Sequence, residues 1–259
     1  MELDGFYINR GIERLFQLGL SGNFNNWYIQ KVFSLDDIEN YQFYSSFPNN
    51  CYTENIDPHI ICGTSHCLYY NKTWIEMLGA LKNNINFGGD KMADVILDYK
   101  LGDKGIGRYG NQYIIHGGNN RLCIGKFMNL KNIQVDVQQF EFDHESFRIY
   151  NKIKAFGFNV EYKKFNDYVL WTLKTNYFEF NIYGSGLVEK FIEYYLSLSL
   201  FKKDYFKILW SNYRKYEHKP FCHIRSVDNF EGLKLQILAF KHQLPLLSEC
   251  GFGNYFNQI

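Results

Sequence analysis

The segment NQYIIHGGNNRLCIGKFMNLKNIQVDV, residues 111–137, carries the pattern on which our expectation for the fold rests. A short apolar run at 113–115 predicts a strand, and a second apolar run at 133–137 predicts another. Between them stand two glycines, two asparagines and an arginine, followed by a segment with helical character. Glycines where a strand gives way to a helix either form a tight turn or let backbone N–H groups approach an anion.

The turn from His116 to Arg121 contains the parts of a phosphate site. The N-terminus of a helix presents unpaired N–H groups and a partial positive charge. Glycine has no Cβ to keep a phosphate oxygen away, and Arg121 can donate to two phosphate oxygens at once. Asn119 and Asn120 can cap the helix or bind an anion or a metal-bound water. The spacing matches neither the Walker pattern nor G-x-G-x-x-G, so a plain capped turn is an equally good interpretation.

The segment YIIHGGNNRLCIGKFMNLKNIQVDV resembles the central motif of the ParB/sulfiredoxin-like superfamily. Members of that superfamily carry a strand, a glycine-rich turn ending in His-Arg or Arg-Arg, a short helix and a further strand. The similarity covers the quoted residues and extends upstream if a helix at 71–84 and a glycine-rich loop at 102–110 are included. The resemblance implies a ParB/sulfiredoxin-like α/β unit whose turn binds nucleotide phosphates, of ATP in sulfiredoxins and free-serine kinases and of CTP in ParB proteins.

Position by position, the resemblance assigns the phosphates to Gly117, Gly118, Asn119, Asn120 and Arg121, with Mg²⁺ accompanying ATP or CTP. Asn120 stands where the family has His or Arg, and His116 stands where many members have Asp. Asn119 stands where sulfiredoxins have their reactive cysteine. The resemblance therefore does not extend to sulfinic-acid reduction, because the nucleophile is missing.

The sequence does not identify the catalytic residues. A kinase-like member needs a carboxylate base to activate a hydroxyl. The candidates are Glu76, on the helix expected at 71–84, His116 in the turn, and Glu145. Spacing does not choose between Glu76 and the other upstream carboxylates, which are Asp90, Asp94 and Asp98. Glu145 belongs to Asp-His-Glu at 143–145, where capping of a helix N-terminus is the commoner explanation.

Three basic residues stand near the turn in the sequence. Lys126 follows Arg121 on the same expected helix, where an exposed lysine on an amphipathic helix is commoner than a phosphate ligand. Lys104 and Arg108 lie in the glycine-rich loop. They either close over a bound nucleotide or are solvated loop charges, and we favour the second interpretation slightly.

Composition limits the class of protein. Of the 259 residues 46% are apolar, which supports a folded core, and 19% are aromatic. The net charge of +1 gives no support to non-specific binding of nucleic acid. No stretch of 18 apolar residues and no signal peptide is evident, so we expect no membrane partner and a cytoplasmic location with reduced cysteines. The six cysteines are scattered; CGTSHC at 62–67 and HKPFCH at 218–223 lack the remaining ligands of a zinc pattern, so we predict no metal site.

The expected fold class is α+β, with the ParB/sulfiredoxin-like unit at 59–140 followed by an antiparallel meander with helices at 141–259. Residues 1–58 are expected to be a helical or irregular N-terminal segment. Helices are expected at 11–20, 34–47, 71–84, 143–157, 185–200, 202–216 and 228–243. Strands are expected at 59–62, 112–115, 133–140, 158–165, 167–174 and 177–184. Residues 92–101 are ambiguous, 102–110 are expected to be a mobile loop, and 218–225 a loop between helices.

The leading hypothesis is a nucleotide-binding protein that hydrolyses a nucleoside triphosphate or transfers its phosphoryl group. One alternative is a DNA-associated nuclease or DNA-binding component of a mobile-element or phage-defence system. A basic stripe at 202–215 would favour that alternative. Another alternative is a non-catalytic interaction protein, because the turn lacks the usual His and Asp. The apolar helices expected at 185–216 also suggest a homo-oligomer.

Overall fold

The computed structural model describes residues 5–20, 26–81, 89–98, 104–166, 168–174, 179–199, 208 and 221–242. The chain forms two compact units, Met1–Phe142 and Asp143–Ile259. Both units combine helices with a mixed β-sheet, so the α+β class expected from the sequence is confirmed. Each unit is described by itself.

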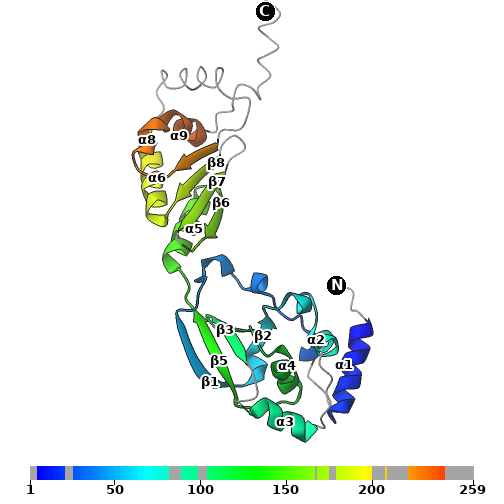
Figure 1. Ribbon diagram of the computed structural model, residues 1–259. Helices are drawn as coiled ribbons and strands as arrows, with labels where there is room; N and C mark the ends of the chain where they lie inside the picture. The colour runs from blue at the N-terminus through cyan, green and yellow to red at the C-terminus, as the bar shows by residue number, and fades with distance from the viewer. Residues whose placement is uncertain are drawn as a thin grey trace, which may run out of the picture. The chain divides into compact units, whose positions relative to one another are not determined.

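The first unit is built on a five-stranded sheet with the order β1-β5-β3-β4-β2 (Figure 1). Its strands are β1 (Asn50–Ile56), β2 (Ile61–Thr64), β3 (Gly105–Tyr109), β4 (Gln112–Ile115) and β5 (Ile133–Phe140). Strands β1 and β5 are antiparallel, as are β3 and β4, whereas β5 runs parallel to β3 and β2 runs parallel to β4. The carboxyl ends of β2 and β4 therefore lie at the same edge of the sheet.

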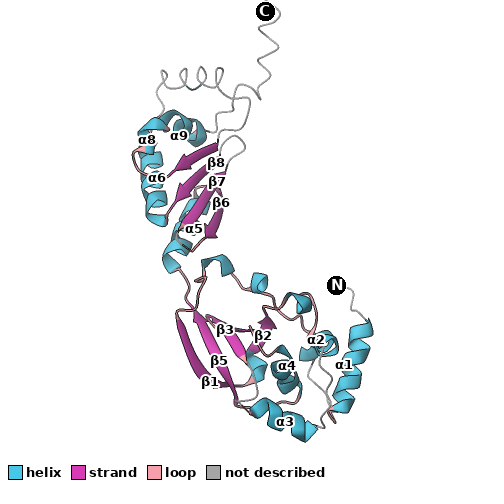
Figure 2. Ribbon diagram, viewed as in Figure 1, coloured by secondary structure: helices cyan, strands magenta, loops and turns pink. Residues whose placement is uncertain are grey.

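Helices α3 (Gly89–Leu97) and α4 (Asn119–Phe127) cover one face of this sheet, α2 (Trp74–Ala80) packs on α4, and α1 (Gly5–Gln17) packs on α2 (Figure 2). Their apolar side chains share one core with the inward positions of the strands. The fully buried members include Met77, Leu78, Ile96, Leu122, Ile106, Ile115, Val135 and Val137. This common core makes the helices and the sheet a single folded unit.

The opposite face of the sheet carries a smaller aromatic cluster around Tyr109, whose ring stacks on Phe140 at a centroid distance of 4.6 Å. Short 3₁₀ turns contribute to it, among them η2 (Leu35–Asp37) and η3 (Tyr41–Phe43). The helix expected at 34–47 is therefore wrong. Its N-terminal signal is real, because the Asp37 carboxylate accepts from the Ser34 N–H and hydroxyl. The helix nevertheless ends after one 3₁₀ turn, because Ile38, with ψ 122°, is already extended.

The loop expected at 102–110 is wrong in its second half, where β3 lies at the centre of the sheet. Gly107 serves close packing in this strand, since an added Cβ would lie 2.4 Å from Nε2 of His116. Gly110 has φ 61° and forms the turn of the β3–β4 hairpin. The ambiguous segment at 92–101 contains the end of α3.

The N-terminal 58 residues are part of the first unit. Strand β1 pairs with β5 over seven residues, and α1 packs against α2. The boundary expected at residue 58 is therefore no boundary of the fold, because a strand pairing and a helix packing cross it. Gly19, with φ 72°, follows the end of α1 as expected, while the helix itself starts earlier than residue 11. The helix expected at 71–84 starts later, after Thr73, and the strand expected at 59–62 is displaced to β2.

The second unit begins with α5 (His144–Ala155), followed by β6 (Asn159–Lys164), β7 (Val169–Lys174) and β8 (Glu179–Tyr183). These strands form the antiparallel meander that the sequence predicts. Then come α6 (Ser185–Ser197), β9 (Phe221–Ile224), α8 (Asn229–Gly232) and α9 (Lys234–Lys241). Strand β9 extends the sheet parallel to β8, so the loop expected at 218–225 is in part a strand. The helix expected at 228–243 is divided in two, and that at 202–216 lies outside the described residues except for Ile208.

The ends of α5 are those expected from the sequence. The Asp143 carboxylate accepts from the Ser146 N–H at 2.9 Å and caps the N-terminus. Gly157, with φ 82°, follows the C-terminus in the left-handed conformation. Helix α5 packs on β6, and α6 packs on β7, β8 and α9, so these helices cover one face of the second sheet.

Candidate functional site

The glycine turn joins β4 to α4 at the carboxyl edge of the two parallel strands β2 and β4. It is anchored to the first residue of β3, because the N–H groups of His116 and Gly117 both donate to the Gly105 carbonyl, at 2.9 and 3.0 Å. Gly118 then takes the left-handed conformation, with φ 75°, and begins the helix as its N-cap. Gly117 therefore shapes the turn, and its own N–H is already used inside the protein.

The N-terminus of α4 offers backbone donors. Gly118 has no side chain, so it provides no cap to the first-turn N–H groups, and the first intrahelical bond runs from Leu122 N–H to the Gly118 carbonyl at 3.0 Å. The N–H groups of Asn119 and Asn120 precede that bond and have no acceptor within the helix itself. All residues of the turn from 116 to 121 are half-buried, so packed side chains do not close over them completely.

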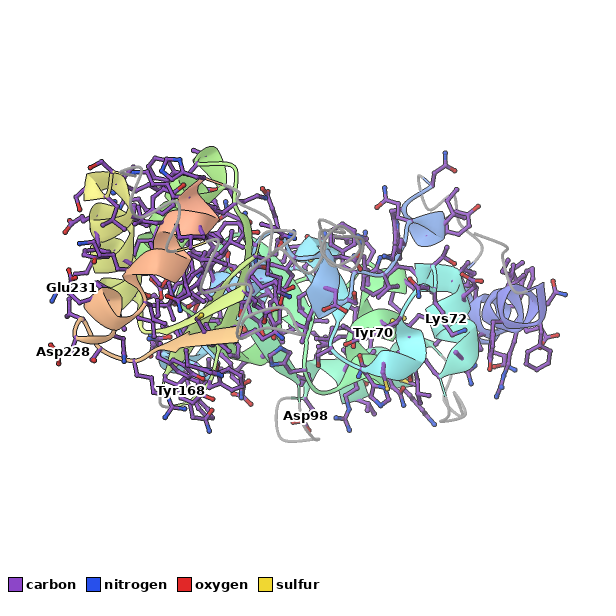
Figure 3. The ribbon with its side chains drawn as sticks, turned by 90° about the horizontal axis from the view of Figure 1, so that it is seen from above. Tyr70, Lys72, Asp98, Tyr168, Asp228 and Glu231 are labelled. Carbon is purple, nitrogen blue, oxygen red and sulfur yellow. The ribbon has the colours of Figure 1, made fainter. Side chains whose placement is uncertain are left out.

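Strand β2 supplies polar groups beside this helix end. The Thr64 hydroxyl donates to the side-chain carbonyl of Asn119 at 2.6 Å, and Ser65 N–H donates to the Ile115 carbonyl at 2.9 Å. The hydroxyl of Tyr70 donates to the Ser65 carbonyl at 3.0 Å (Figure 3 labels Tyr70). These bonds fix the Asn119 side chain and join the end of β2 to the glycine turn. Sequence reasoning missed Thr64 and Ser65, and only their position after a short apolar run could have indicated them.

Charged groups of both signs surround Lys104 at the same corner. Lys104 precedes β3 and is buried, with its ammonium donating to the carbonyls of Ile96 and Asp98 at 2.7 and 3.1 Å. Burial lowers the pKa of Lys104 and the charge of Arg121 lowers it further, while the carboxylates of Asp98 and Asp136 oppose that shift. Lys104 is therefore a buried cation in the electrostatic neighbourhood of Arg121, and the solvated-loop interpretation is wrong for it.

Arg108, the second of the two charges in the glycine-rich loop, points away from the glycine turn. It lies in β3, where its guanidinium donates to the Tyr52 hydroxyl at 3.0 Å and to the Gly110 carbonyl at 3.2 Å. Gly110 belongs to the hairpin at the far end of β3 from the glycine turn. The solvated-loop interpretation is also wrong for Arg108, since the residue is half-buried within a strand.

Lys126 is neither an exposed lysine nor a phosphate ligand. Its side chain is 5% exposed, and its ammonium donates to the Ile61 carbonyl at 2.6 Å. The same ammonium lies over the Trp74 ring at 4.0 Å and the Trp27 ring at 5.3 Å. Burial lowers the pKa of Lys126 to about 8. The amphipathic pattern of α4 failed here because two tryptophans and a strand carbonyl replace water around the charge.

His116 lies on the face of the sheet opposite to α4. Its ring packs over Gly107, with Nδ1 3.1 Å from Gln138 Oε1 and Nε2 3.3 Å from the Tyr109 hydroxyl. Burial lowers the pKa of His116, while its hydrogen bond to Gln138 opposes that shift. The imidazole is therefore neutral at pH 7 and contributes no charge to the corner.

The remaining catalytic candidates serve structural contacts. The Glu76 carboxylate accepts from the Thr73 N–H and hydroxyl, both at 2.7 Å, which forms a capping box at the start of α2. Glu145 belongs to the second unit and pairs with Arg148 at 2.7 Å. Glu76 therefore caps α2 within the first unit, and Glu145 forms an ion pair within the second unit.

The potential metal ligands are dispersed within the described part of the chain. No group of three or more His, Cys, Asp or Glu side chains there is placed to hold a metal ion. His66 is exposed and caps the turn η5 (Cys67–Tyr69), whereas Cys62 lies half-buried with its thiol 3.4 Å from the Tyr113 carbonyl. His218 lies outside the described residues.

Comparison with known protein families, with curated proteins and with solved structures finds no match to this chain. The ParB/sulfiredoxin-like resemblance therefore stays a prediction from the residues that carry it. Over the described residues, no helix has both the length and the apolar character needed to cross a membrane.

Proposed function

We propose that the protein binds a nucleoside triphosphate, with the phosphates at the N-terminus of α4. The observation that carries this proposal is the combination of an N-cap glycine, a half-open turn and two neighbouring cations at one edge of a sheet. A helix N-terminus favours anions through its unpaired N–H groups and its dipole. In open sheets, ligands bind beyond the carboxyl ends of parallel strands, which is where β2 and β4 end.

Each residue of the turn has a distinct role in this proposal. Gly118 lets phosphate oxygens approach the backbone, and the N–H groups of Asn119 and Asn120 donate to them. Arg121 supplies charge, and Lys104 adds to the local positive potential from its buried position. Gly117 fixes the turn through Gly105 and makes no direct contact with the nucleotide.

Magnesium enters this proposal with the nucleotide. The described residues do not offer a cluster of ligands for a resident cation. Mg²⁺ often keeps several waters and binds chiefly through substrate phosphates, with few protein ligands. The proposed ligand is accordingly the Mg²⁺ complex of ATP or CTP.

Binding is better supported than catalysis. Glu76 is engaged in a capping box, His116 is held by Gln138 and Tyr109, and Glu145 is paired with Arg148 in the other unit. Hydrolysis or phosphoryl transfer would need a base that none of these contacts provides. We therefore propose a nucleotide-binding protein in which the bound nucleotide regulates or stabilises the first unit.

The test is a thermal-shift and calorimetric titration of the full chain with ATP, CTP and GTP, each with and without Mg²⁺. A ligand at a hundred times its Kd stabilises the folded protein by about 2.7 kcal/mol. Arg121→Ala should weaken binding by about 10- to 100-fold, the value of a lost charge-assisted hydrogen bond. Arg108→Ala is the matched control. The Arg108 guanidinium donates to the Tyr52 hydroxyl, away from the turn, so this substitution should leave nucleotide affinity unchanged.

Phosphate release measured in the same samples separates binding from hydrolysis. Binding without release supports a regulatory nucleotide site. Equal affinity in the wild type, Arg121→Ala and Arg108→Ala would place the nucleotide elsewhere. Absence of any nucleotide-dependent stabilisation would refute the proposed function.

A further inference from the structure

The two faces of the sheet in the second unit carry different side chains. The described helices α5, α6 and α9 pack over the face formed by buried side chains such as Trp171, Phe180 and Ile182. Successive residues of a strand point to opposite faces. The other face therefore carries a row of polar side chains across all four strands: Glu161, Thr172, Asn181 and His223. The two central members of this row, Thr172 and Asn181, are buried and bonded to each other, whereas Glu161 and His223 are exposed. Figure 3 shows Tyr168 beyond the strands, on the side away from these helices.

Four aromatic rings lie next to one another along one end of this face. Phe165 stacks on Tyr168 at a centroid distance of 4.7 Å, and Tyr168 lies 5.7 Å from Tyr183. Tyr183 stacks on His223 at 6.0 Å, and its hydroxyl is 3.1 Å from His223 Nδ1. We call these four residues the aromatic ladder.

The ladder is accessible, although rings of this size are normally buried. Phe165 is 43% exposed and Tyr168 is 46% exposed, and His223 is also exposed. Phe165 and Tyr168 belong to the β6–β7 hairpin, whose strands are paired up to Lys164 and Val169. The ladder therefore stands on paired backbone and not on a free loop. Its geometry is held by the strands even though its rings face solvent.

Two cations accompany the ladder. Lys163 is exposed at the end of β6, on the same side of the strand as Glu161 and Phe165, and the Arg225 guanidinium lies over the Tyr183 ring at 5.1 Å. Lys164, the next residue, points to the opposite face. The acid nearest in the strand row, Glu161, is neutralised by Lys174 at 2.6 Å. Asp167, next to Tyr168 in the sequence, lies outside the described residues.

We propose that this face of the second unit binds single-stranded nucleic acid, with bases stacking on the aromatic ladder and phosphates contacting Lys163 and Arg225. Single-strand binding surfaces combine aromatic side chains, on which bases stack, with cations along the backbone path. Unpaired bases are required, because a duplex hides the faces of its bases. A protein partner with an apolar surface fits less well, since the remaining row of this face is polar and its edge is cationic.

The experiment is fluorescence anisotropy of a labelled oligothymidylate of about 15 nucleotides with the full chain, titrated at several salt concentrations. Two cations on a single strand predict a slope of about −1.4 in log K against log salt. Oligouridylate and duplex competitors show whether the strand is DNA, RNA or either, and whether it must be single. Competition by duplex as strong as by single strand would contradict base stacking and overturn the proposal.

Variants separate stacking from charge. Tyr168→Ala should weaken binding by about tenfold and leave the salt slope unchanged, whereas Tyr168→Phe should bind like the wild type. Arg225→Gln should weaken binding and reduce the slope by about 0.7. Phe156→Ala is the matched control, because Phe156 is 41% exposed after α5 and takes no part in the ladder. Far-UV circular dichroism confirms that each variant is folded.

Two further results would overturn the proposal. One is no binding of oligothymidylate by the wild type at low salt; if Tyr168→Ala then changes the oligomeric state, the face is a protein interface instead. The other is equal binding by the wild type, Tyr168→Ala and Phe156→Ala. Arg121→Ala should retain oligonucleotide binding, which keeps this test independent of the nucleotide site in the first unit.

Discussion

Replacing Lys126 by Met removes an ammonium group that the first unit buries between two tryptophan rings. The side chain is 5% exposed, and burial lowers its pKa from the ordinary value of 10.5 to about 8. In the unfolded chain the same lysine keeps its ordinary pKa. Folding therefore disfavours the charged form of Lys126, in spite of its hydrogen bond to the Ile61 carbonyl.

The sign and size of the pH dependence follow from these two pKa values. Between pH 8 and pH 10.5 the unfolded chain holds the proton and the folded protein has lost it, so the free energy of unfolding rises with pH in that window. The full change is about 3 kcal/mol, at 1.36 kcal/mol for each unit of pKa. Between pH 7 and pH 9.5 the part gained is about 2 kcal/mol.

The assay is urea denaturation of the wild type and Lys126→Met at pH 7, 8, 9 and 9.5, fitted with separate transitions for the two units. Buried tyrosines and cysteines also titrate at alkaline pH, but they are present in both proteins and cancel in the difference. The free energy of unfolding of the wild type minus that of Lys126→Met should therefore rise by about 2 kcal/mol from pH 7 to pH 9.5. At pH 7 the difference in the free energy of unfolding also includes the cost of leaving the Ile61 carbonyl without its hydrogen-bond donor. Only the change of this difference with pH therefore tests the pKa of Lys126.

Lys152→Met provides the control for exchanging a lysine for a methionine at an exposed position, because Lys152 is exposed on α5. A flat difference for Lys126→Met over the same range would mean that Lys126 titrates as it does in water. The assignment of its ammonium to a desolvated aromatic site would then be wrong.

Further predictions concern backbone packing and helix capping in the first unit. Gly63→Ala should destabilise by about 1–3 kcal/mol or more in urea denaturation, because its Cβ would lie 2.0 Å from the Phe33 carbonyl oxygen; Gly186→Ala, which meets nothing within 4 Å, should not destabilise. A wild-type midpoint for Gly63→Ala would contradict the close strand packing. Thr73→Ala should cost about 1–2 kcal/mol by removing a hydroxyl bonded to the buried Glu76 carboxylate, with nucleotide affinity unchanged in calorimetry. If Thr73→Ala instead lowers nucleotide affinity without lowering stability, Glu76 contributes to the nucleotide site and the capping role is wrong.

Local signals in the sequence predict well those elements that local interactions determine. The strand, glycine turn, helix and strand of 112–140 form as expected, and Gly118 takes the left-handed conformation that such a turn requires. The meander of β6, β7 and β8 and the cap of α5 by Asp143 are also confirmed. In each case the determining residues lie within a few positions of one another.

Contacts between distant segments explain what the sequence alone missed. Strand β1 is recognised only through its pairing with β5, and β9 only through its pairing with β8. Gly105 and Gly107 look like a flexible loop, but the packing of His116 over Gly107 requires a glycine in a strand. The burial of Lys126 could not be predicted for the same reason, because the two tryptophans that bury it come from distant segments of the chain.

The candidate site shows the same division. The glycines, Asn119, Asn120 and Arg121 are adjacent in sequence, so a motif could predict that they act together. Thr64 reaches this corner because β2 pairs with β4. Lys104 reaches it because the residue immediately before β3 is buried there. No spacing rule connects either of them with the turn before the fold is known.

The central claim is that backbone N–H groups at the start of α4 bind phosphate. The most direct test is a titration of ¹⁵N-labelled protein with Mg²⁺ and ATP or CTP, followed by the backbone amide resonances of Gly118, Asn119 and Asn120. The account predicts that these three amides shift most, with saturation at the affinity found by calorimetry and little change at Gly117, whose N–H is bonded to Gly105. Largest shifts in another part of the chain, with the α4 amides unmoved at saturation, would contradict it.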